Sequence, residues 1–344
     1  MTLRCAVCSL ILLTLRAALA GPSPMPDPSH NLTLTAPITT WDEAVPLGNG
    51  LLGGLLWGED GTLRLSLDRG DLWDERPAPG NPLAGFTCAQ MARLVAARDN
   101  AAISKVVDGA YASDHPTKIP AGRIEFDLAA GQAVTAFALD LASATGRAQL
   151  GDAGAVDAFF SADEPVALIR LPGAAPRAVR LLAPESVKKL GYPDPVRGMQ
   201  EGAQWFVQPA AEGTSYCIFV GQRRVGDATL VATTVAYSPA DGADVVGAAR
   251  RRVEAALAAG YAAMHEPHAA WWRGFWAKSA VQVPDAEVMR HYLLVQYFYG
   301  AASRTGAPPI PLQGVWTADA GDLPPWKGDY HHDLNTQMTY MGYQ

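Results

Sequence analysis

The sequence is short of basic residues, of cysteines and of long apolar runs, and each shortage narrows what the protein can be. Lys and Arg number 27 against 34 Asp and Glu, and a net charge of −7 argues against a nucleic-acid partner. No stretch after residue 20 is long and apolar enough to span a bilayer. After residue 20 the cysteines are Cys88 and Cys217, and the sequence leaves open whether they pair.

The chain does have the composition of a soluble globular protein with large cores. Hydrophobic residues make up 49% of the 344 residues, and the mean hydropathy is +0.02. These values exclude a disordered or fibrous chain. At about 100–200 residues per domain, the length allows two or three domains, and nothing in the sequence fixes the oligomeric state.

The N-terminus has the three parts of a secretory signal peptide. Arg4 supplies the basic part, an apolar run follows from Cys5 to Leu15, and Ala18–Ala20 supplies the small residues of a cleavage site. We therefore predict that residues 1–20 are a signal peptide. The mature protein is then secreted or periplasmic and has no membrane association after the signal is removed.

Residues 33–238 carry the pattern of many short β-strands separated by turns. The clearest strand is Thr62–Leu67, in which leucines alternate with other residues after a Glu-Asp-Gly turn. The glycines of Leu47–Gly54 are typical of a tight β-turn and not of a phosphate-binding loop. Cys88–Tyr111 has helical spacing and is predicted to be a helical excursion from the sheets. Further strands are predicted at Arg123–Leu128, Ala136–Leu141, Val156–Phe160, Val166–Leu171, Trp205–Val207, Tyr216–Val220 and Ala228–Ala236.

After the last predicted strand the hydrophobic period changes to that of a helix. Val245–Met264 and His268–Lys278 predict linker helices, and packing is the best explanation of the aromatic face of the second. Glu287–Ser303 predicts a strong helix with Asp285 as its N-cap. Asp333–Tyr343 predicts the start of another helix.

The densest group of functional residue types lies between Leu312 and Met338. Flat Trp rings stack on the apolar face of a sugar, while carboxylates and amides bind its hydroxyls, so the mixture is typical of a carbohydrate cleft. A zinc site is not favoured, because the two histidines are adjacent and no HExxH or cysteine pattern accompanies them. A Ser-His-Asp hydrolase is not favoured either, because GxSxG is absent. The group comprises Trp316, Asp319, Asp322, Trp326, Asp329, Tyr330, His331, His332, Asp333 and Asn335.

Three blocks of sequence stand in order along nearly the whole mature chain. They are Trp41–Gly53 with Leu67–Trp73, then Trp271–Ser279, and then Leu312–Trp316 (LQGVW) with Pro324–Trp326 and Asp333–Met338 (DLNTQM). Together the blocks resemble the glycoside hydrolase family of α-L-fucosidases and α-L-galactosidases that is numbered 95. The third block is the most specific of the three.

The resemblance implies a multidomain β + α fold: an N-terminal antiparallel β-sandwich, a helical linker and an (α/α)6 barrel that holds the active site. Accordingly we assign residues 21–240 to the sandwich, 241–283 to the linker and 284–344 to the beginning of the barrel. Twelve barrel helices with their loops need on the order of 200 residues. We therefore expect an incomplete barrel, and an inactive fragment that lacks the family's general acid.

The resemblance also implies a mechanism and a set of site residues. Similar family members invert configuration: a later glutamic acid protonates the leaving oxygen, and an Asn-x-Asn pair positions the attacking water. That pair falls on Asp333 and Asn335, the predicted catalytic residues. Asp333 either takes the proton of the water itself, or it binds a sugar hydroxyl or caps the helix that begins there. The predicted substrate-binding residues are Trp316, Trp326, His331, His332 and Gln337, and neither a metal nor an organic cofactor is implied.

The leading hypothesis is therefore an exported glycoside hydrolase that releases a terminal α-linked L-fucose, or a similar sugar, from glycans. The carboxylate in place of the first amide alters the wall that faces the sugar, so the identity of that sugar stays open. The alternative is a non-catalytic protein, either a carbohydrate-binding one or a structural β-sandwich that packs against a separate catalytic chain.

Overall fold

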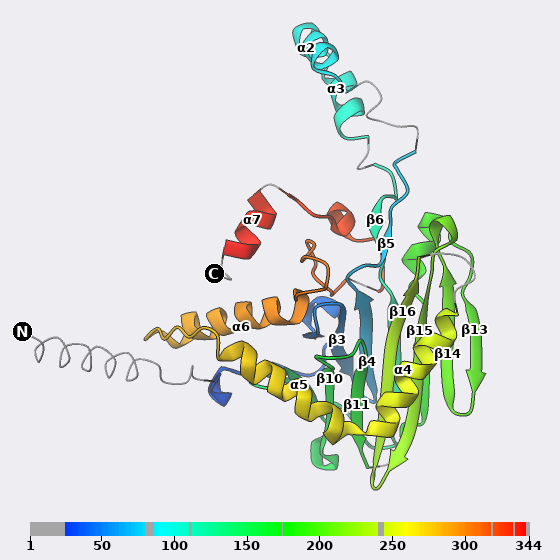
Figure 1. Cartoon of the computed structure of the whole chain (residues 1–344), viewed down its shortest axis with the longest axis vertical. Coiled ribbons are helices and arrows are strands. Elements are labelled where there is room, and N and C mark those ends of the chain that lie inside the picture. The colour runs from blue at the N-terminus through cyan, green and yellow to red at the C-terminus, as the bar shows by residue number, and fades with distance from the viewer. Residues whose placement is uncertain are drawn as a thin grey trace, which may run out of the picture.

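The fold is a sandwich of two antiparallel sheets flanked by helices (Figure 1). It is seen in a computed structural model that describes residues 25–79, 86–109, 112–173, 175–239, 244–317, 319–332 and 334–341. The predicted signal peptide and Asp333 lie outside these described residues. Within them, no helix has the length and apolar character needed to cross a membrane.

The larger sheet has nine strands in the described residues, and all of its neighbouring strands are antiparallel. In spatial order they are β1 (Leu32–Thr35), β8 (Ala136–Asp140), β9 (Thr145–Gln149), β10 (Ala155–Phe160), β11 (Ala167–Pro172), β16 (Ala228–Ser238), β15 (Ser215–Val225), β14 (Ala203–Pro209) and β13 (Val196–Gln200).

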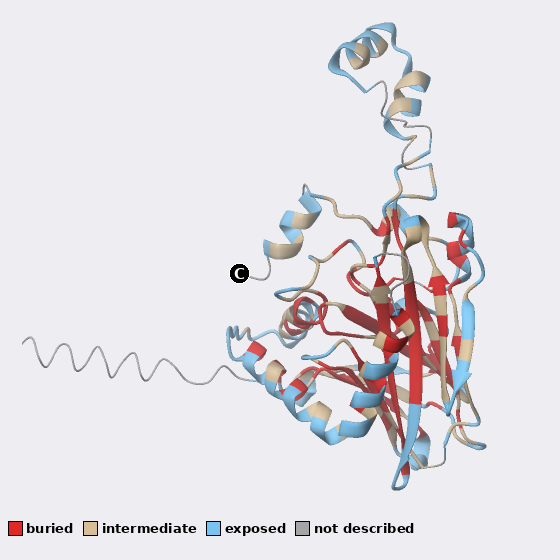
Figure 2. Ribbon diagram, turned by 45° about the vertical axis from the view of Figure 1, so that its right-hand side comes forward, coloured by how far each residue is buried: buried red, intermediate tan, exposed pale blue. Residues whose placement is uncertain are grey.

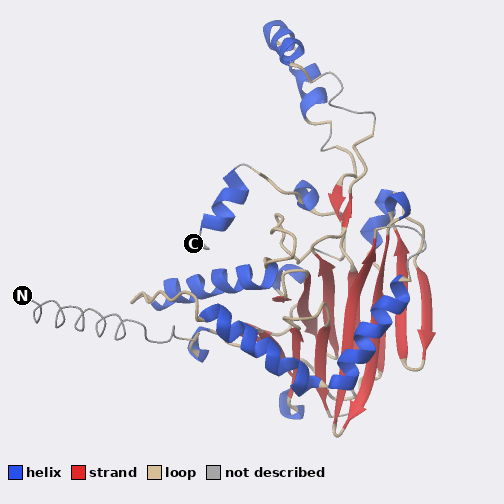
Figure 3. Ribbon diagram, viewed as in Figure 1, coloured by secondary structure: helices blue, strands red, loops and turns tan. Residues whose placement is uncertain are grey.

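The smaller sheet has five antiparallel strands, and a two-stranded ribbon of β5 (Trp73–Asp74) and β6 (Thr117–Lys118) extends the sandwich at one end (Figure 3). The β2–β3 connection is the tight turn predicted for the glycine-rich segment. The five strands, in order, are β12 (Ala178–Leu182), β7 (Gly122–Asp127), β4 (Thr62–Arg69), β3 (Leu52–Glu59) and β2 (Val45–Gly48).

The main core lies between the two sheets (Figure 2). The predicted alternation in β4 is confirmed, because Leu63, Leu65 and Leu67 are all at most 2% exposed and belong to this core. Strand β16 and residues 216–221 of β15 are instead buried on both faces, as near-continuous apolar runs often are. Ile218 of β15 belongs to the main core, whereas its neighbour Phe219 belongs to a second core.

The second core is covered by helix α4 (Val245–Ala259). Its small residues Ala249 and Val253 are fully buried against β15 and β16, so the helix lies close to the sheet. Cys217 is buried in this core, whereas Cys88 is exposed, and both thiols are free.

The aromatic face of the linker is a packing surface. It belongs to helix α5 (Tyr261–Trp276), whose Trp272 is fully buried and stacks on Tyr297 with the ring centroids 5.2 Å apart. Tyr297 lies in the next helix, α6 (Ala286–Ala302), which Asp285 caps as predicted by accepting hydrogen bonds from the first two backbone amides after Ala286. The tryptophans of the linker thus join α5 and α6 to the sandwich.

One helical pair projects from the sandwich, as the helical spacing of residues 88–111 predicts. Helix α2 (Cys88–Ala97) and helix α3 (Asn100–Val107) extend from the β5–β6 ribbon and contain no buried residue (Figures 1 and 2). The last helix, α7 (Leu334–Met341), lies apart from the sheets, beyond α6 (Figure 1).

The glycines of the β2–β3 hairpin allow α6 and the chain after it to touch the smaller sheet. A Cβ atom on Gly48 would lie 2.5 Å from the carbonyl oxygen of Ala301, and one on Gly53 would lie 2.2 Å from that of Val315. Real Cβ atoms do not come so close to backbone oxygens, so any side chain here would push these segments apart.

We predict that Gly53→Ala lowers the free energy of unfolding by about 2 kcal/mol or more, because overpacking of this contact forces the backbone to shift. Urea unfolding followed by tryptophan fluorescence measures the change. The matched control is Gly61→Ala in the β3–β4 turn, where the nearest heavy atom to a new Cβ lies 3.7 Å away. Equal stability of the two variants would contradict this account of the contact.

A buried histidine ties α5 to the larger sheet. The Nε2 atom of His268 lies 2.8 Å from the Ser143 carbonyl oxygen, and Nδ1 is buried without a partner. Nε2 is therefore the donor, and a proton on Nδ1 would find no acceptor. Burial, aided by the neighbouring His265, lowers the pKa of His268 to about 3.

Stability should consequently fall as the pH decreases from 6.5 towards 3. In this range His268 binds a proton in the unfolded chain but stays neutral in the folded protein. The loss approaches about 1.4 kcal/mol per pH unit for this one group, and burial lowers the pKa of His265 in the same direction. In urea titrations between pH 4.5 and 7, His268→Gln should flatten the dependence. The exposed control His291→Gln should leave it unchanged, and an equal slope in all three proteins would refute the assignment.

Candidate functional site

A cavity of about 540 Å³ lies between α6, the chain from Ile310 to Trp316, and α7. Three of the predicted site residues, Trp316, His331 and Asn335, line it. They come from two segments that are separate in sequence: the LQGVW block, and the DLNTQM block with the residues just before it. The fold therefore brings the two most specific blocks to one place.

The sandwich holds one wall of this cavity in position. The indole Nε1 of Trp316 donates a 2.8 Å hydrogen bond to the carbonyl oxygen of Leu47 in β2. On α6, the Tyr297 hydroxyl donates a 2.7 Å bond to the Pro46 carbonyl. In the hairpin turn, the Gly50 amide donates a 2.7 Å bond to the carbonyl of Ala301 at the end of α6. The LQGVW segment and α6, which together form this wall, are thus fixed to the same hairpin.

A buried ion pair anchors the chain that leaves this wall. The Lys118 ammonium and Asp68 carboxylate are 2.5 Å apart, with side chains 1% and 2% exposed. The second oxygen of Asp68 accepts a 3.0 Å hydrogen bond from the backbone amide of Thr317. Removing either charge would leave the other buried without compensation, which is costly.

A second buried carboxylate, Asp319, holds the same segment two residues later. It accepts a 3.1 Å bond from the Ser66 hydroxyl and lies 3.1 Å from the Arg123 guanidinium. Burial raises the pKa of Asp319, with Arg123 acting in the opposite direction. Because both of its oxygens are bound to the sandwich, Asp319 is a structural anchor and not a group that reaches a substrate.

The opposite wall of the cavity contains the acidic and aromatic residues that follow the anchor. The Asp329 carboxylate bonds to Nδ1 of His331, and this contact fixes the imidazole beside the cavity. Tyr330 stacks between Trp73 of β5 and His332, with centroid distances of 5.3 and 5.6 Å. These contacts attach the wall to the β5–β6 ribbon.

Helix α7 lines the cavity and is attached on two sides. The hydroxyl of Thr336 donates a 2.6 Å bond to the carbonyl of His331. On the other side, the Tyr299 hydroxyl of α6 donates to the carbonyl of Thr339, and Tyr340 accepts a 2.9 Å bond from the amide of Ile310. Asn335, in the first turn of α7, therefore faces a cavity with defined walls.

The other predicted site residues do not line this cavity. Trp326 is 64% exposed and lines a neighbouring cavity, while His332 and Gln337 are exposed beside the site. The structure therefore does not place all five predicted substrate-binding residues in one cavity. The proposed base Asp333 lies outside the described residues, between His331 and Asn335 in sequence.

Three lining residues were not selected from the sequence. Asp329 belongs to the polar group between Leu312 and Met338, Gln313 belongs to the LQGVW block, and Tyr299 lies in the helix predicted at Glu287–Ser303. Asp329 and Gln313 adjoin or belong to the selected motifs, whereas Tyr299 carries no such signal. Only the folded chain places Tyr299 of α6 opposite the later segments.

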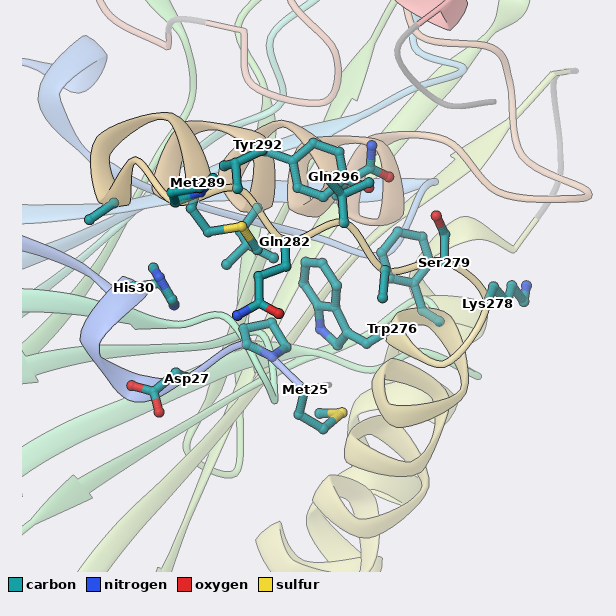
Figure 4. A pocket seen from close by; sticks show the side chains of 18 residues that line it. Met25, Asp27, His30, Trp276, Lys278, Ser279, Gln282, Met289, Tyr292 and Gln296 are labelled. Atoms are coloured by element: carbon teal, nitrogen blue, oxygen red, sulfur yellow. The ribbon is translucent and has the colours of Figure 1, made fainter. Parts of the chain in front are cut away.

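A larger cavity, of about 660 Å³, lies elsewhere, between residues 25–30, the end of the linker and α6 (Figure 4). Met25, Trp276 and Met289 give it a mainly apolar wall. Its one carboxylate among the described lining residues is Asp27, which caps the turn at Ser29. Its Asp27 and His30 belong to the short turn at residues 27–30, and none of the predicted site residues lines this cavity, so the smaller one is the candidate active site. Over the described residues no cluster of His, Cys, Asp and Glu has the arrangement of a metal site.

Comparison with known proteins assigns the chain to a family. Residues 32–215, more than half of the chain, match the model of the glycosyl hydrolase family 65 N-terminal domain, and residues 262–344 match that of the glycosyl hydrolase family 95 catalytic domain. No curated protein sequence matches. A solved structure with TM-score 0.52 and 10% identity, described provisionally as a kojibiose phosphorylase from human microbiome, is covered over 43% of its length by 87% of this chain.

The structural match establishes the fold alone, since the identity is low, and the chain spans less than half of that protein. The expected likeness to family 95 is confirmed for the C-terminal quarter, and the β-sandwich fold is confirmed by the family 65 domain and the solved structure. The chain belongs to the glycoside hydrolases, with a family 65-type N-terminal domain followed by family 95 catalytic-domain sequence.

Proposed function

We propose that this chain forms the sandwich and the first catalytic segment of an exported, inverting glycoside hydrolase that releases a terminal α-linked L-fucose or a similar sugar from glycans. The observation that carries the proposal is the cavity between α6 and α7. His331 and Asn335, which flank position 333 in sequence, both line it together with Trp316. A polar wall opposite an aromatic one suits a sugar ring.

In this proposal Asp333 accepts the proton of the attacking water and Asn335 orients that water by a hydrogen bond. Inversion requires a carboxylic acid about 6.5–9.5 Å from the base, on the other side of the glycosidic bond, so that the water fits between base and sugar. The family 95 resemblance assigns that acid to a later barrel glutamate. The proton of the acid goes to the leaving oxygen, and the water oxygen forms the new bond to the anomeric carbon.

Hydrolysis fits this cavity better than phosphorolysis does. A phosphorylase binds a phosphate dianion, which is usually held by Arg, Lys or a cluster of backbone amides. Among the described residues that line the cavity there is neither Lys nor Arg, and Asp329 adds a carboxylate. Such a wall repels phosphate and admits water.

His331 is the proposed orienting residue for a sugar hydroxyl. Its Nδ1 is bound by Asp329, so Nε2 is available to face the cavity in one fixed ring orientation. The Trp316 ring, bonded at its indole nitrogen to Leu47, offers a fixed aromatic surface beside it. Neither residue needs to move on binding.

The test is the loss of turnover in a polypeptide that carries this chain together with a whole family 95 barrel. Asp333→Asn and Asp333→Ala should each reduce kcat on an aryl α-L-fucoside by about 100-fold or more, since both remove a proton acceptor. The exposed control Asp163→Asn should retain kcat. A loss of less than about tenfold in the Asp333 variants would sink the base assignment.

The same assay distinguishes the second class of function. The 344 residues alone are expected to release no sugar, because the proposed acid is not among residues 284–344. If the longer polypeptide binds fucose but also fails to hydrolyse any α-fucoside, the protein is a carbohydrate-binding one and the enzymatic proposal is wrong.

A further inference from the structure

The neighbouring cavity that Trp326 lines has a volume of about 550 Å³ and is called the second cavity below. It lies where the projecting helical pair meets the chain after the LQGVW block. Asp108, at the end of α3, and Asp114 contribute from one side. Leu323, Trp326 and Lys327 contribute from the other. The predicted mechanism uses none of the groups contributed by the helical pair.

Trp326 is displayed in this cavity by an unusual backbone. Trp326 and Lys327 both have left-handed conformations, with φ of 53° and 60°, and Gly328 follows with φ of 59°. Bulky residues rarely adopt this conformation because it raises their free energy, so surrounding contacts must stabilise it. Such strained positions are concentrated at ligand-binding sites.

Contacts with the base of the helical pair hold this turn in place. The Thr117 hydroxyl of β6 donates a 3.3 Å bond to the Lys327 carbonyl, and the Lys327 ammonium donates to the Ser113 carbonyl. A side chain at position 328 would come within 2.9 Å of the Cβ of Lys118, which explains the glycine there. The turn therefore presents an indole that is 64% exposed on a rigid support.

The two cavities adjoin at one aromatic contact. His331 lines the candidate active site and Trp326 lines the second cavity, and their rings meet edge to face with centroids 5.8 Å apart. Consecutive sugars of a glycan are joined through a single oxygen. A glycan whose terminal sugar lies beside His331 would therefore extend along Trp326.

We propose that this second cavity is the subsite for the leaving group, and that it takes a neutral oligosaccharide. This inference rests on the proposed function: an enzyme that removes one terminal sugar has the rest of its substrate on the leaving-group side. The exposed face of Trp326 stacks on a sugar ring, and Asp108 and Asp114 accept hydrogen bonds from hydroxyls. Two carboxylates and a lysine that is already bonded to Ser113 disfavour sulfated or sialylated glycans.

Binding can be measured on the 344-residue chain without any turnover. Lactose titrated into the ¹⁵N-labelled chain should shift the indole signal of Trp326, identified by its loss in Trp326→Phe, with a Kd on the order of 1 mM. Asp114→Asn should weaken binding by about threefold or more, and the exposed control Asp163→Asn should not change it. An unmoved Trp326 signal overturns the subsite, as does equal binding of 3′-sialyllactose.

Kinetics in the polypeptide with a whole barrel separates this inference from the proposed function. Trp326→Ala should lower kcat/KM for a fucosylated lactose by about tenfold but change that for α-L-fucosyl fluoride, whose single-atom leaving group does not reach the subsite, by less than about twofold. Trp326→Phe, which keeps a flat ring, should recover most of the loss. Equal losses on both substrates overturn the subsite, whereas a wild-type protein inactive on both overturns the proposed function.

Discussion

The close contact between the β2–β3 hairpin and the helical segment is the constraint on which the rest of the molecule depends. Gly48 and Gly53 let Ala301 and Val315 approach within distances that any side chain would forbid. The hairpin backbone then accepts hydrogen bonds from Trp316 and from α6. A family 65-type sandwich thus serves as the rigid base for catalytic-domain sequence, and the cavity walls are positioned by sheet backbone instead of by flexible loops.

The buried charges support the same arrangement. Asp68 and Asp319 are anchors, because their oxygens are occupied by Lys118, Thr317, Ser66 and Arg123. The carboxylate that lines the candidate active site among the described residues, Asp329, comes after this anchored stretch and binds His331. Along the chain the anchor Asp319 comes first, the turn at Trp326 follows, and the polar wall with Asp329 comes last. This order explains why Asp319 and Asp329, which are close in sequence, have different roles.

Much of the fold could be predicted from the sequence, because β4, β8 and β10 have clear apolar patterns and Asp285 is a strong cap. The edge strand β13 could not, since its residues are largely exposed and carry no alternation, and β9 has too few apolar residues. In the site, Trp316, His331 and Asn335 do share a cavity. Trp326 was expected with them, but its left-handed turn carries it into the next cavity, and such a turn at two bulky residues has no sequence signal.

The most direct test of the central claim is the configuration of the first product, followed by ¹H NMR in a polypeptide that carries this chain and a whole family 95 barrel. A single displacement by water on an α-linked L-fucoside predicts that the β-anomer of the free sugar appears first and then mutarotates. Initial release of the α-anomer would contradict inversion. Formation of a sugar 1-phosphate, dependent on added phosphate, would contradict hydrolysis in this cavity altogether.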